Sequence, residues 1–200
     1  TTYNDTGRVK IGKNIIYNYD KRAFGRQTMT NVLEKSINSG AVFAENQLGN
    51  NLFLDYINRF GFFKPTGIDL QGEIFSQNKE FKKGYEINFA TASFGQGIEI
   101  TPIQLIKAFS IIANGGKSVR PYVVEKIFKD GQMAITEPEK SLKRVISERT
   151  CSQLAAMLVS VVKNGPYTRR AKIPGYYIAG KTGTSQVSWS ALGINKRGYS

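Results

Sequence analysis

Residues 28–61, TMTNVLEKSINSGAVFAENQLGNNLFLDYINRFG, decide the fold because three helical stretches follow one another there. Thr28 or Thr30 can cap the first helix. The polar residues 38–40 interrupt the helical spacing, which then resumes until Gly49. The third stretch has apolar residues at i, i+1, i+4, i+5 and i+8, which predicts a short helix before a terminating glycine. Those apolar residues are Leu52, Phe53, Tyr56, Ile57 and Phe60.

The regions on either side of this stretch differ from each other in pattern. Residues 1–27 are polar and rich in turns, and their alternation is typical of strands. Residues 62–98 are interrupted by glycines and predict a loop with brief extended pieces. Thr101-Pro102 predicts a helix start, because a capping residue precedes a proline in the first turn. The apolar spacing between Ser147 and Lys163 predicts one more helix.

Strands are expected at two further places. The turn residues Asp130-Gly131 predict a hairpin within residues 119–135, and the apolar residues 176–179 predict a strand that leads into Lys181. Helices outnumber these strands. The sequence therefore predicts an α+β domain, with too few strands to close a complete sheet.

Two absences restrict the chemistry. The 200 residues include no histidine, which excludes Ser-His-Asp and Cys-His catalysis and histidine-ligated zinc within this chain. The single cysteine, Cys151, excludes an internal disulfide and a cysteine-cluster metal site. Any proton transfer in catalysis must therefore use lysine, hydroxyl or carboxylate groups.

The positive charge is concentrated toward the C-terminal end. The formal net charge is +13, and residues 140–200 contain eleven basic residues and one acidic residue. Such a region attracts nucleic acid, anionic lipid headgroups or an anionic polymer, and a merely solvated surface is an equal alternative. No repeat of arginine with aromatic residues occurs, so nucleic acid is not expected as a partner. No apolar run approaches the roughly 20 residues that span a bilayer.

The triplet Lys181-Thr182-Gly183 occurs once, where chance predicts only about 0.1 occurrences at this composition. A lysine beside a hydroxyl offers charge and hydrogen bonds to a carboxylate, and the glycine allows a ligand to approach the backbone. The alternative is an edge strand with a solvated lysine.

Two serine motifs are no more frequent than chance. Ser-x-Asn occurs at Ser36-Ile37-Asn38 and at Ser76-Gln77-Asn78, where about one occurrence is expected, and a capped break between helices explains the first equally well. Ser-x-x-Lys, in which lysine can deprotonate serine, occurs at Ser76 and at Ser160. Both are interpreted as chance matches, one in a polar loop and one at a helix end.

The order of these motifs resembles the penicillin-binding transpeptidase family, specifically its monofunctional class B D,D-transpeptidases. The resemblance rests on Ser-x-Asn with its flanks at residues 32–41, then on Phe94-Gly95-Gln96-Gly97 with Thr101-Pro102-Ile103-Gln104-Leu105, and finally on Lys181-Thr182-Gly183-Thr184. It covers nearly the whole chain. The implied fold is a partial penicillin-binding protein or serine β-lactamase-like fold, with a helical subdomain and part of an antiparallel sheet.

The chain departs from the family at the nucleophile. In the family the Ser-x-x-Lys motif precedes Ser-x-Asn, but no serine occurs before Ser36. We therefore expect residues 1–200 to be an internal part of one transpeptidase domain, truncated at both ends and carrying two of its three motifs. By itself this part is expected to be inactive.

The resemblance implies catalytic roles for three residues. Ser36 would relay a proton toward the leaving amine, and Asn38 would hydrogen-bond the absent lysine and the substrate amide. Lys181 would keep Ser36 poised and attract the substrate carboxylate.

The same resemblance implies a substrate-binding strip next to Lys181. The hydroxyls of Thr182 and Thr184 would hold the substrate carboxylate, and Gly183 would leave room for the peptide. The backbone N–H of Thr184 would supply half of the oxyanion hole, a kind of contact whose loss typically costs about 2.7–4 kcal/mol of barrier. No cofactor and no metal are implied.

The implied substrate is a peptidoglycan stem peptide ending in D-Ala-D-Ala, which is cross-linked through a serine acyl-enzyme, and β-lactam antibiotics are implied inhibitors. The implied location is the extracytoplasmic (periplasmic) face of the bacterial cytoplasmic membrane, with the anchor outside these residues and cell-wall synthesis proteins as partners. A role in elongation or in division stays open. The alternatives are a non-catalytic module that binds the cell wall or a partner, and a β-lactam sensor or β-lactamase-like relative.

Overall fold

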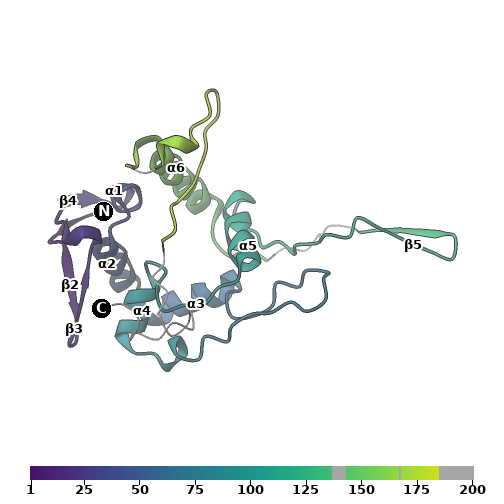
Figure 1. Ribbon diagram of the computed structural model, residues 1–200, viewed down its shortest axis with the longest axis horizontal. Helices are drawn as coiled ribbons and strands as arrows, with labels where there is room; N and C mark the ends of the chain where they lie inside the picture. The colour runs from purple at the N-terminus through teal and green to yellow at the C-terminus, as the bar shows by residue number, and fades with distance from the viewer. Residues whose placement is uncertain (137–142, 167, 185–200) are drawn as a thin grey trace, which may run out of the picture.

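Four short strands at the start of the chain form two antiparallel pairs, as the strand-like pattern of residues 1–27 predicts. The structure is a computed structural model that describes residues 1–136, 143–166 and 168–184 (Figure 1). The first strand pairs with the fourth and the second with the third. The strands are β1 (Thr2–Asp5), β2 (Arg8–Ile11), β3 (Asn14–Tyr17) and β4 (Gly25–Thr28), with a 3₁₀ turn, η1 (Tyr19–Lys21), before the last.

Three consecutive helices occur where residues 28–61 predict three helical stretches. They are α1 (Met29–Lys35), α2 (Asn38–Leu48) and α3 (Asn50–Phe60). The predicted break at residues 38–40 is wrong, because these residues begin the second helix and the break lies at Ser36 and Ile37. Thr28 caps α1 by accepting a hydrogen bond from the backbone N–H of Asn31. Gly61 ends α3 in the left-handed conformation, which a residue without Cβ adopts at little cost.

The region from 62 to 98 is more ordered than predicted. It contains a 3₁₀ turn, η2 (Phe81–Lys83), and a short helix, α4 (Glu86–Ala92), so the prediction of a loop is wrong there. The helix α5 (Pro102–Ala113) begins as predicted, with Thr101 and Gln104 bonding each other in a capping box.

The last elements include a hairpin, β5 (Lys126–Lys129) and β6 (Gln132–Ile135), which extends far from the helices in Figure 1. The predicted hairpin around Asp130-Gly131 is thereby confirmed. The long helix α6 (Glu148–Asn164) follows with Ser147 as its cap, and a 3₁₀ turn, η3 (Arg169–Ala171), comes after it. The predicted strand at residues 176–179 is wrong, because this segment is neither strand nor helix.

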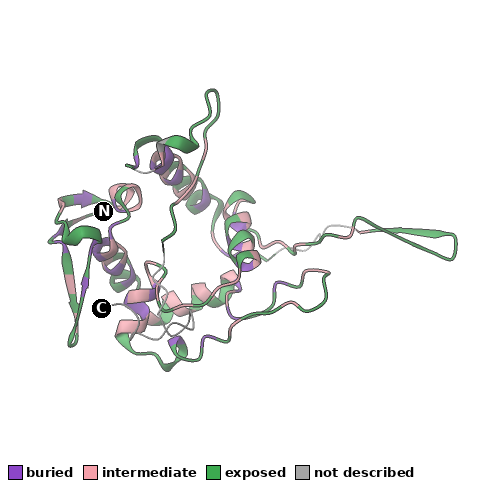
Figure 2. Cartoon of the chain, in the orientation of Figure 1, coloured by how far each residue is buried: buried purple, intermediate pink, exposed green. Residues whose placement is uncertain are grey.

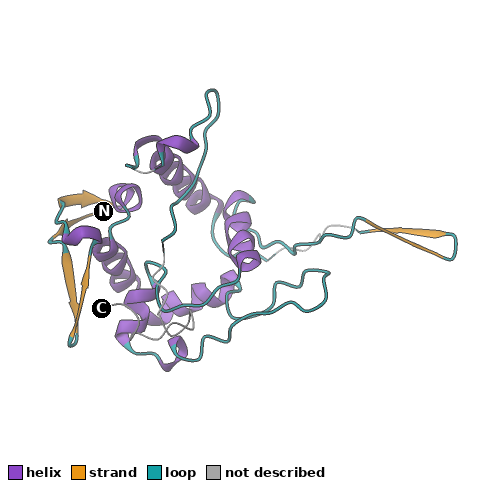
Figure 3. Ribbon diagram, in the orientation of Figure 1, coloured by secondary structure: helices purple, strands orange, loops and turns teal. Residues whose placement is uncertain are grey.

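Two clusters of buried hydrophobic residues lie beside α2 and α4, and further buried residues lie on α5 and α6 (Figure 2). One cluster is aromatic and packs α3 against α4, and the other packs α2 and α4 against the β2–β3 pair. The mixture of helices and small antiparallel pairs in Figure 3 confirms the α+β prediction. The buried members of the clusters are Phe63, Phe81, Phe89 and Ala92, and then Ile16, Val42 and Ala90.

Candidate active site

Ser36 lies at the end of α1, where the chain leaves the helix. Its backbone is left-handed, with φ 53° and ψ 53°, and its N–H donates to the carbonyl of Leu33 at 3.3 Å. The N–H of Ile37 closes the turn on the carbonyl of Val32 at 3.0 Å. Ile37 is buried while Ser36 is exposed, so the turn fixes the backbone and presents the hydroxyl to solvent.

Lys181 meets Ser36 across 145 positions of sequence. The Nζ of Lys181 donates to Ser36 Oγ at 2.9 Å, and it also reaches the carbonyl and the hydroxyl of Thr182, at 3.2 and 3.0 Å. Lys181 is half-buried, and burial lowers the pKa of its ammonium because desolvation disfavours the charged form. The structure therefore brings one residue from each predicted motif into direct contact.

The other predicted site residues differ in what their side chains contact. Asn38, in the first turn of α2, donates its side-chain N–H to the carbonyl of Tyr17 at 3.0 Å. Thr182 accepts from Lys181, as described above, and Gly183 and Thr184 are exposed. A Cβ built on Gly183 would meet nothing within 4 Å, so this backbone is open on that side.

A buried polar network holds the start of α2, directly after the Ser36 turn. Asp5 is 2% exposed and accepts hydrogen bonds from the hydroxyl of Ser39 at 2.6 Å and from the amide of Asn18 at 2.9 Å. The backbone N–H groups of Gly7 and Phe24 also donate to it. Burial alone would raise the pKa of Asp5, but these hydrogen bonds outweigh it and hold the pKa below its ordinary value.

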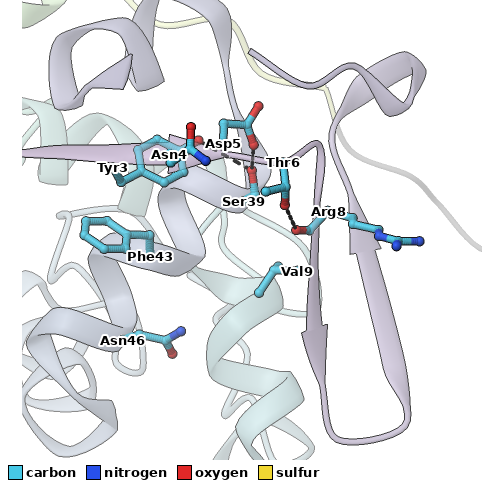
Figure 4. A pocket seen from close by; sticks show the side chains of 9 residues that line it. All are labelled: Tyr3, Asn4, Asp5, Thr6, Arg8, Val9, Ser39, Phe43 and Asn46. Atoms are coloured by element: carbon cyan, nitrogen blue, oxygen red, sulfur yellow. Dashed lines mark hydrogen bonds between the residues drawn. The ribbon is translucent and has the colours of Figure 1, made fainter. Parts of the chain in front are cut away.

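Two members of this network line a small pocket of about 170 Å³ between β1, β2 and α2 (Figure 4). Asp5 and Ser39 line it, together with Tyr3 and Phe43, whose rings stack with centroids 5.2 Å apart. Ser36 and Lys181 are not among its lining residues. The pocket is therefore separate from the contact between Ser36 and Lys181, and it lies beside the polar network that holds the start of α2. Sequence reasoning missed this support, because Asp5, Asn18 and Ser39 are far apart in the chain and form no motif.

Both chance matches to Ser-x-x-Lys have their hydroxyls bound to carboxylates. Ser76, in the loop before α4, donates to Glu99, which lies between α4 and α5. Ser160 donates to Glu34 of α1 at 2.5 Å. A serine whose hydroxyl proton is held by a carboxylate is not arranged for deprotonation by the lysine three residues later.

Neither a metal centre nor a membrane span emerges from the part of the chain that the structure describes. No three side chains of the metal-binding types gather there. None of the helices described is both long enough and apolar enough to cross a bilayer.

A comparison of the whole chain with models of protein families points to the same family as the two motifs that meet at Ser36 and Lys181. The family model described as the penicillin binding protein transpeptidase domain matches residues 1–196. The chain belongs to this transpeptidase family. The class B resemblance found in the sequence motifs is thereby confirmed.

Curated relatives of this family match most of the chain. Stage V sporulation protein D of Bacillus subtilis is 35% identical over 184 residues, which are 91% of this chain and 28% of the relative. Peptidoglycan D,D-transpeptidase FtsI of Escherichia coli K12 is 31% identical over 84% of this chain and 27% of the relative. The chain thus spans little more than a quarter of the length of these relatives.

Solved structures of the family confirm the fold. Penicillin binding protein 3 of Mycobacterium tuberculosis, solved with aztreonam, has a TM-score of 0.80 at 28% identity and matches 94% of this chain and 43% of its own. The D,D-transpeptidase domain from Eggerthella lenta has a TM-score of 0.79 at 26% identity, over 94% of this chain and 49% of that one. The predicted partial transpeptidase fold is therefore confirmed.

Proposed function

We propose that this chain supplies two sides of the active site of a serine-type peptidoglycan D,D-transpeptidase. The observation that carries the proposal is the 2.9 Å hydrogen bond between Lys181 and Ser36. It joins two motifs that lie 145 positions apart in the sequence. The names of the relatives, which include peptidoglycan D,D-transpeptidases, support the same activity.

The proposed reaction forms and breaks one bond in each half. A serine oxygen attacks the carbonyl carbon of the penultimate D-alanine of a stem peptide, and terminal D-alanine leaves with a proton on its amine. The amine of a second stem peptide then attacks the resulting ester, which forms the cross-link and regenerates the serine. β-Lactams would acylate the same serine, and the neighbouring structures solved with aztreonam and ampicillin support this.

We assign the proton relay in this reaction to Ser36. The ammonium of Lys181 donates to Ser36 Oγ, so the hydroxyl proton of Ser36 is free to point toward the leaving amine. The ammonium of Lys181 is partly desolvated, so less water screens its charge and its electrostatic interaction with Ser36 and with a bound carboxylate is stronger. Asn38 would bind the substrate amide and the catalytic lysine of the absent motif.

The substrate carboxylate would lie against residues 182–184. Thr182 and Thr184 offer hydroxyls, Lys181 offers positive charge, and the open side of Gly183 leaves room for a peptide backbone. The N–H of Thr184 would bind the developing oxyanion together with the N–H of the nucleophile.

We further propose that residues 1–200 form one partial transpeptidase domain of a longer, membrane-anchored protein at the extracytoplasmic face of the membrane. The fraction of each relative that the chain matches supports this. The nucleophilic serine would precede Thr1, so the 200 residues alone would not react.

Labelling with a fluorescent penicillin tests the proposal. The longer protein should form one covalent adduct per molecule, and residues 1–200 alone should form none. In the longer protein, Lys181→Ala should slow acylation by a factor of about 100 or more, since a positioned electrostatic group is worth several kcal/mol. Lys172→Ala, at an exposed lysine of the same segment, is the control. Stable labelling of the 200 residues at Ser76 or Ser160, or an unchanged rate in Lys181→Ala, would contradict the proposal.

A further inference from the structure

The last two turns of α6 contact both segments that form the candidate site, and a serine within them, Ser160, is not used by the proposed mechanism. The hydroxyl of Ser160 donates to Glu34 Oε1 at 2.5 Å, and the amide of Asn164 donates to the same oxygen at 3.3 Å and to Ser160 Oγ at 3.0 Å. Glu34 lies in the last turn of α1, two residues before Ser36. The side chains of α6 therefore hold the end of α1 that carries Ser36.

The backbones of α1 and of the residue after α6 also approach each other closely near Glu34. A Cβ built on Gly165, just after α6, would lie 3.2 Å from the carbonyl oxygen of Glu34, a distance tighter than most Cβ contacts. The carboxylate of Glu34 is also bound by the amide of Asn31 at 3.0 Å, within α1. Burial by itself raises the pKa of Glu34, but these hydrogen bonds and the charge of Lys35 hold it below its ordinary value. Glu34 is therefore ionised and fully engaged at neutral pH.

The same part of α6 also contacts the segment that carries Lys181. The N–H of Gly180 donates to the carbonyl of Leu158 at 3.3 Å, and a Cβ on Gly180 would lie 3.3 Å from Cγ2 of Val162. Ser160 lies between these two residues of α6. Residues 158–165 thus contact α1 through Glu34, and they contact residues 172–184, the Lys181 segment, through Gly180.

The helix α1 needs such an external contact. It has only 7 residues, and helices shorter than about 12 residues are marginally stable by themselves. It contacts α6 more extensively than it contacts α2 or β4, so the position of the Ser36 turn depends chiefly on the side of α1 that faces α6.

We propose that Ser160 and Glu34 are positioning residues, which fix the distance between Ser36 and Lys181 by fastening α1 to α6. The inference rests on the proposed transpeptidase function, in which Ser36 and Lys181 act together. A displacement of about 1 Å at a reacting group can reduce a rate by about a hundredfold. The Ser-x-x-Lys match at Ser160 thus coincides with a structural hydroxyl.

The test uses the longer protein that contains these residues, with benzylpenicillin as the acylating agent. In Ser160→Ala and in Glu34→Ala, the rate constant of acylation at saturating penicillin should fall about 10- to 100-fold, while the penicillin concentration at half saturation changes little. The fraction of molecules finally acylated should stay near that of the wild type. A role limited to folding would lower that fraction and leave the rate constant of the folded molecules unchanged.

Two variants sharpen the result. Glu34→Gln keeps an oxygen acceptor for the Ser160 hydroxyl and should restore most of the rate lost in Glu34→Ala. Ser152→Ala removes a hydroxyl of α6 that bonds only the carbonyl of Glu148, at 3.1 Å, among the contacts described, and it should acylate like the wild type. Wild-type rates in both alanine variants, or a Glu34→Gln variant as slow as Glu34→Ala, would overturn the inference.

A second measurement does not depend on acylation. Reductive methylation with ¹³C-formaldehyde allows the pKa of Lys181 to be followed by NMR, with Lys181→Arg assigning the signal. In Ser160→Ala this pKa should rise toward the ordinary lysine value, because the displaced end of α1 leaves the ammonium more exposed to water. An unchanged pKa would overturn the inference. If the wild-type protein is not acylated, the proposed function fails, and the Lys181 pKa still decides the positioning role.

Discussion

The two segments that meet at the candidate site are built in different ways. Residues 1–48, the Ser36 platform, contain two strand pairs, two helices and a buried polar network around Asp5. Residues 172–184, the Lys181 segment, contain neither helix nor strand, and Tyr177 within it is 92% exposed. In the platform, substitutions away from Glu34, Ser36 and Asn38 should change the stability of the protein. In the segment, they should change the chemistry and leave stability nearly unaffected.

The largest effect on stability is expected at Asp5. Asp5→Ala leaves the backbone N–H groups of Gly7 and Phe24 without their acceptor, and unsatisfied buried groups cost about 1–3 kcal/mol each. It also removes one of the acceptors of Asn18 and Ser39. We expect a loss of about 3 kcal/mol in the free energy of unfolding, measured in urea at neutral pH. Asp55→Ala, at an exposed helix position, is the control. A loss below about 1 kcal/mol would mean that the network does not support the platform.

The stabilising effect of Asp5 should depend on pH in a defined direction. Its native pKa is lowered, so its contribution is present above the ordinary value of 3.8 and is lost as the pH falls through the native pKa. The difference between wild type and Asp5→Ala should therefore shrink in acid.

The second effect compares two glycines, one in each region. A Cβ on Gly40 would lie 2.5 Å from Cγ2 of Val32, which forces α1 away from α2. Gly40→Ala should cost about 1–3 kcal/mol, the usual range for overpacking. Gly183→Ala meets open space and should change stability by less than about 0.5 kcal/mol. In the longer protein, however, Gly183→Ala should slow acylation, because the methyl group occupies the proposed path of the peptide. Equal stability losses in the two variants would contradict the distinction between the regions.

The smallest effect is expected at Glu45, an unfavourable residue within the otherwise well-packed platform. Glu45 is 4% exposed, and its Oε1 has no hydrogen-bond partner among the residues described. Burial raises the pKa of Glu45 above its ordinary value of 4.5. Glu45→Gln removes the buried charge and should stabilise the protein by about 1 kcal/mol at neutral pH.

The pH dependence of the Glu45 effect has the opposite sign to that of Asp5. Because the native pKa is raised, the wild type is relatively most stable below pH 4.5 and loses stability as the pH rises through the native pKa. The gain from Glu45→Gln should therefore appear in thermal unfolding at neutral pH and vanish in acid. A gain that persists at low pH would indicate a packing effect.

The same contrast explains how much of the structure could be predicted. The helices of the platform begin and end at local signals, such as the Thr28 cap and the glycines at 49 and 61, and these are readable from sequence. The helix α4 was missed because it is short and lies in a glycine-rich region. Its burial on several sides gives no clear period, since Phe89, Ala90 and Ala92 are all buried.

The wrong strand lies in the Lys181 segment for a related reason. The residues Tyr176 to Ala179 have side chains typical of strands, but strand propensity depends on a neighbouring strand that provides hydrogen bonds. Among the described residues this segment has no such neighbour, and its contact is with α6 instead. For the candidate site, the order of the motifs predicted Ser36 and Lys181, whose side chains the structure places in contact. That order gave no information about Asp5, Ser160 or Glu34, whose contacts join distant positions.

The left-handed turn at Ser36 has an evolutionary consequence. Glycine adopts this backbone conformation without the steric penalty of a Cβ, so for the backbone alone glycine is the better choice at position 36. A lineage relieved of the need for the hydroxyl would be free to drift toward that easier residue. A glycine there in a related chain would therefore mark a descendant that keeps the architecture after abandoning the reaction.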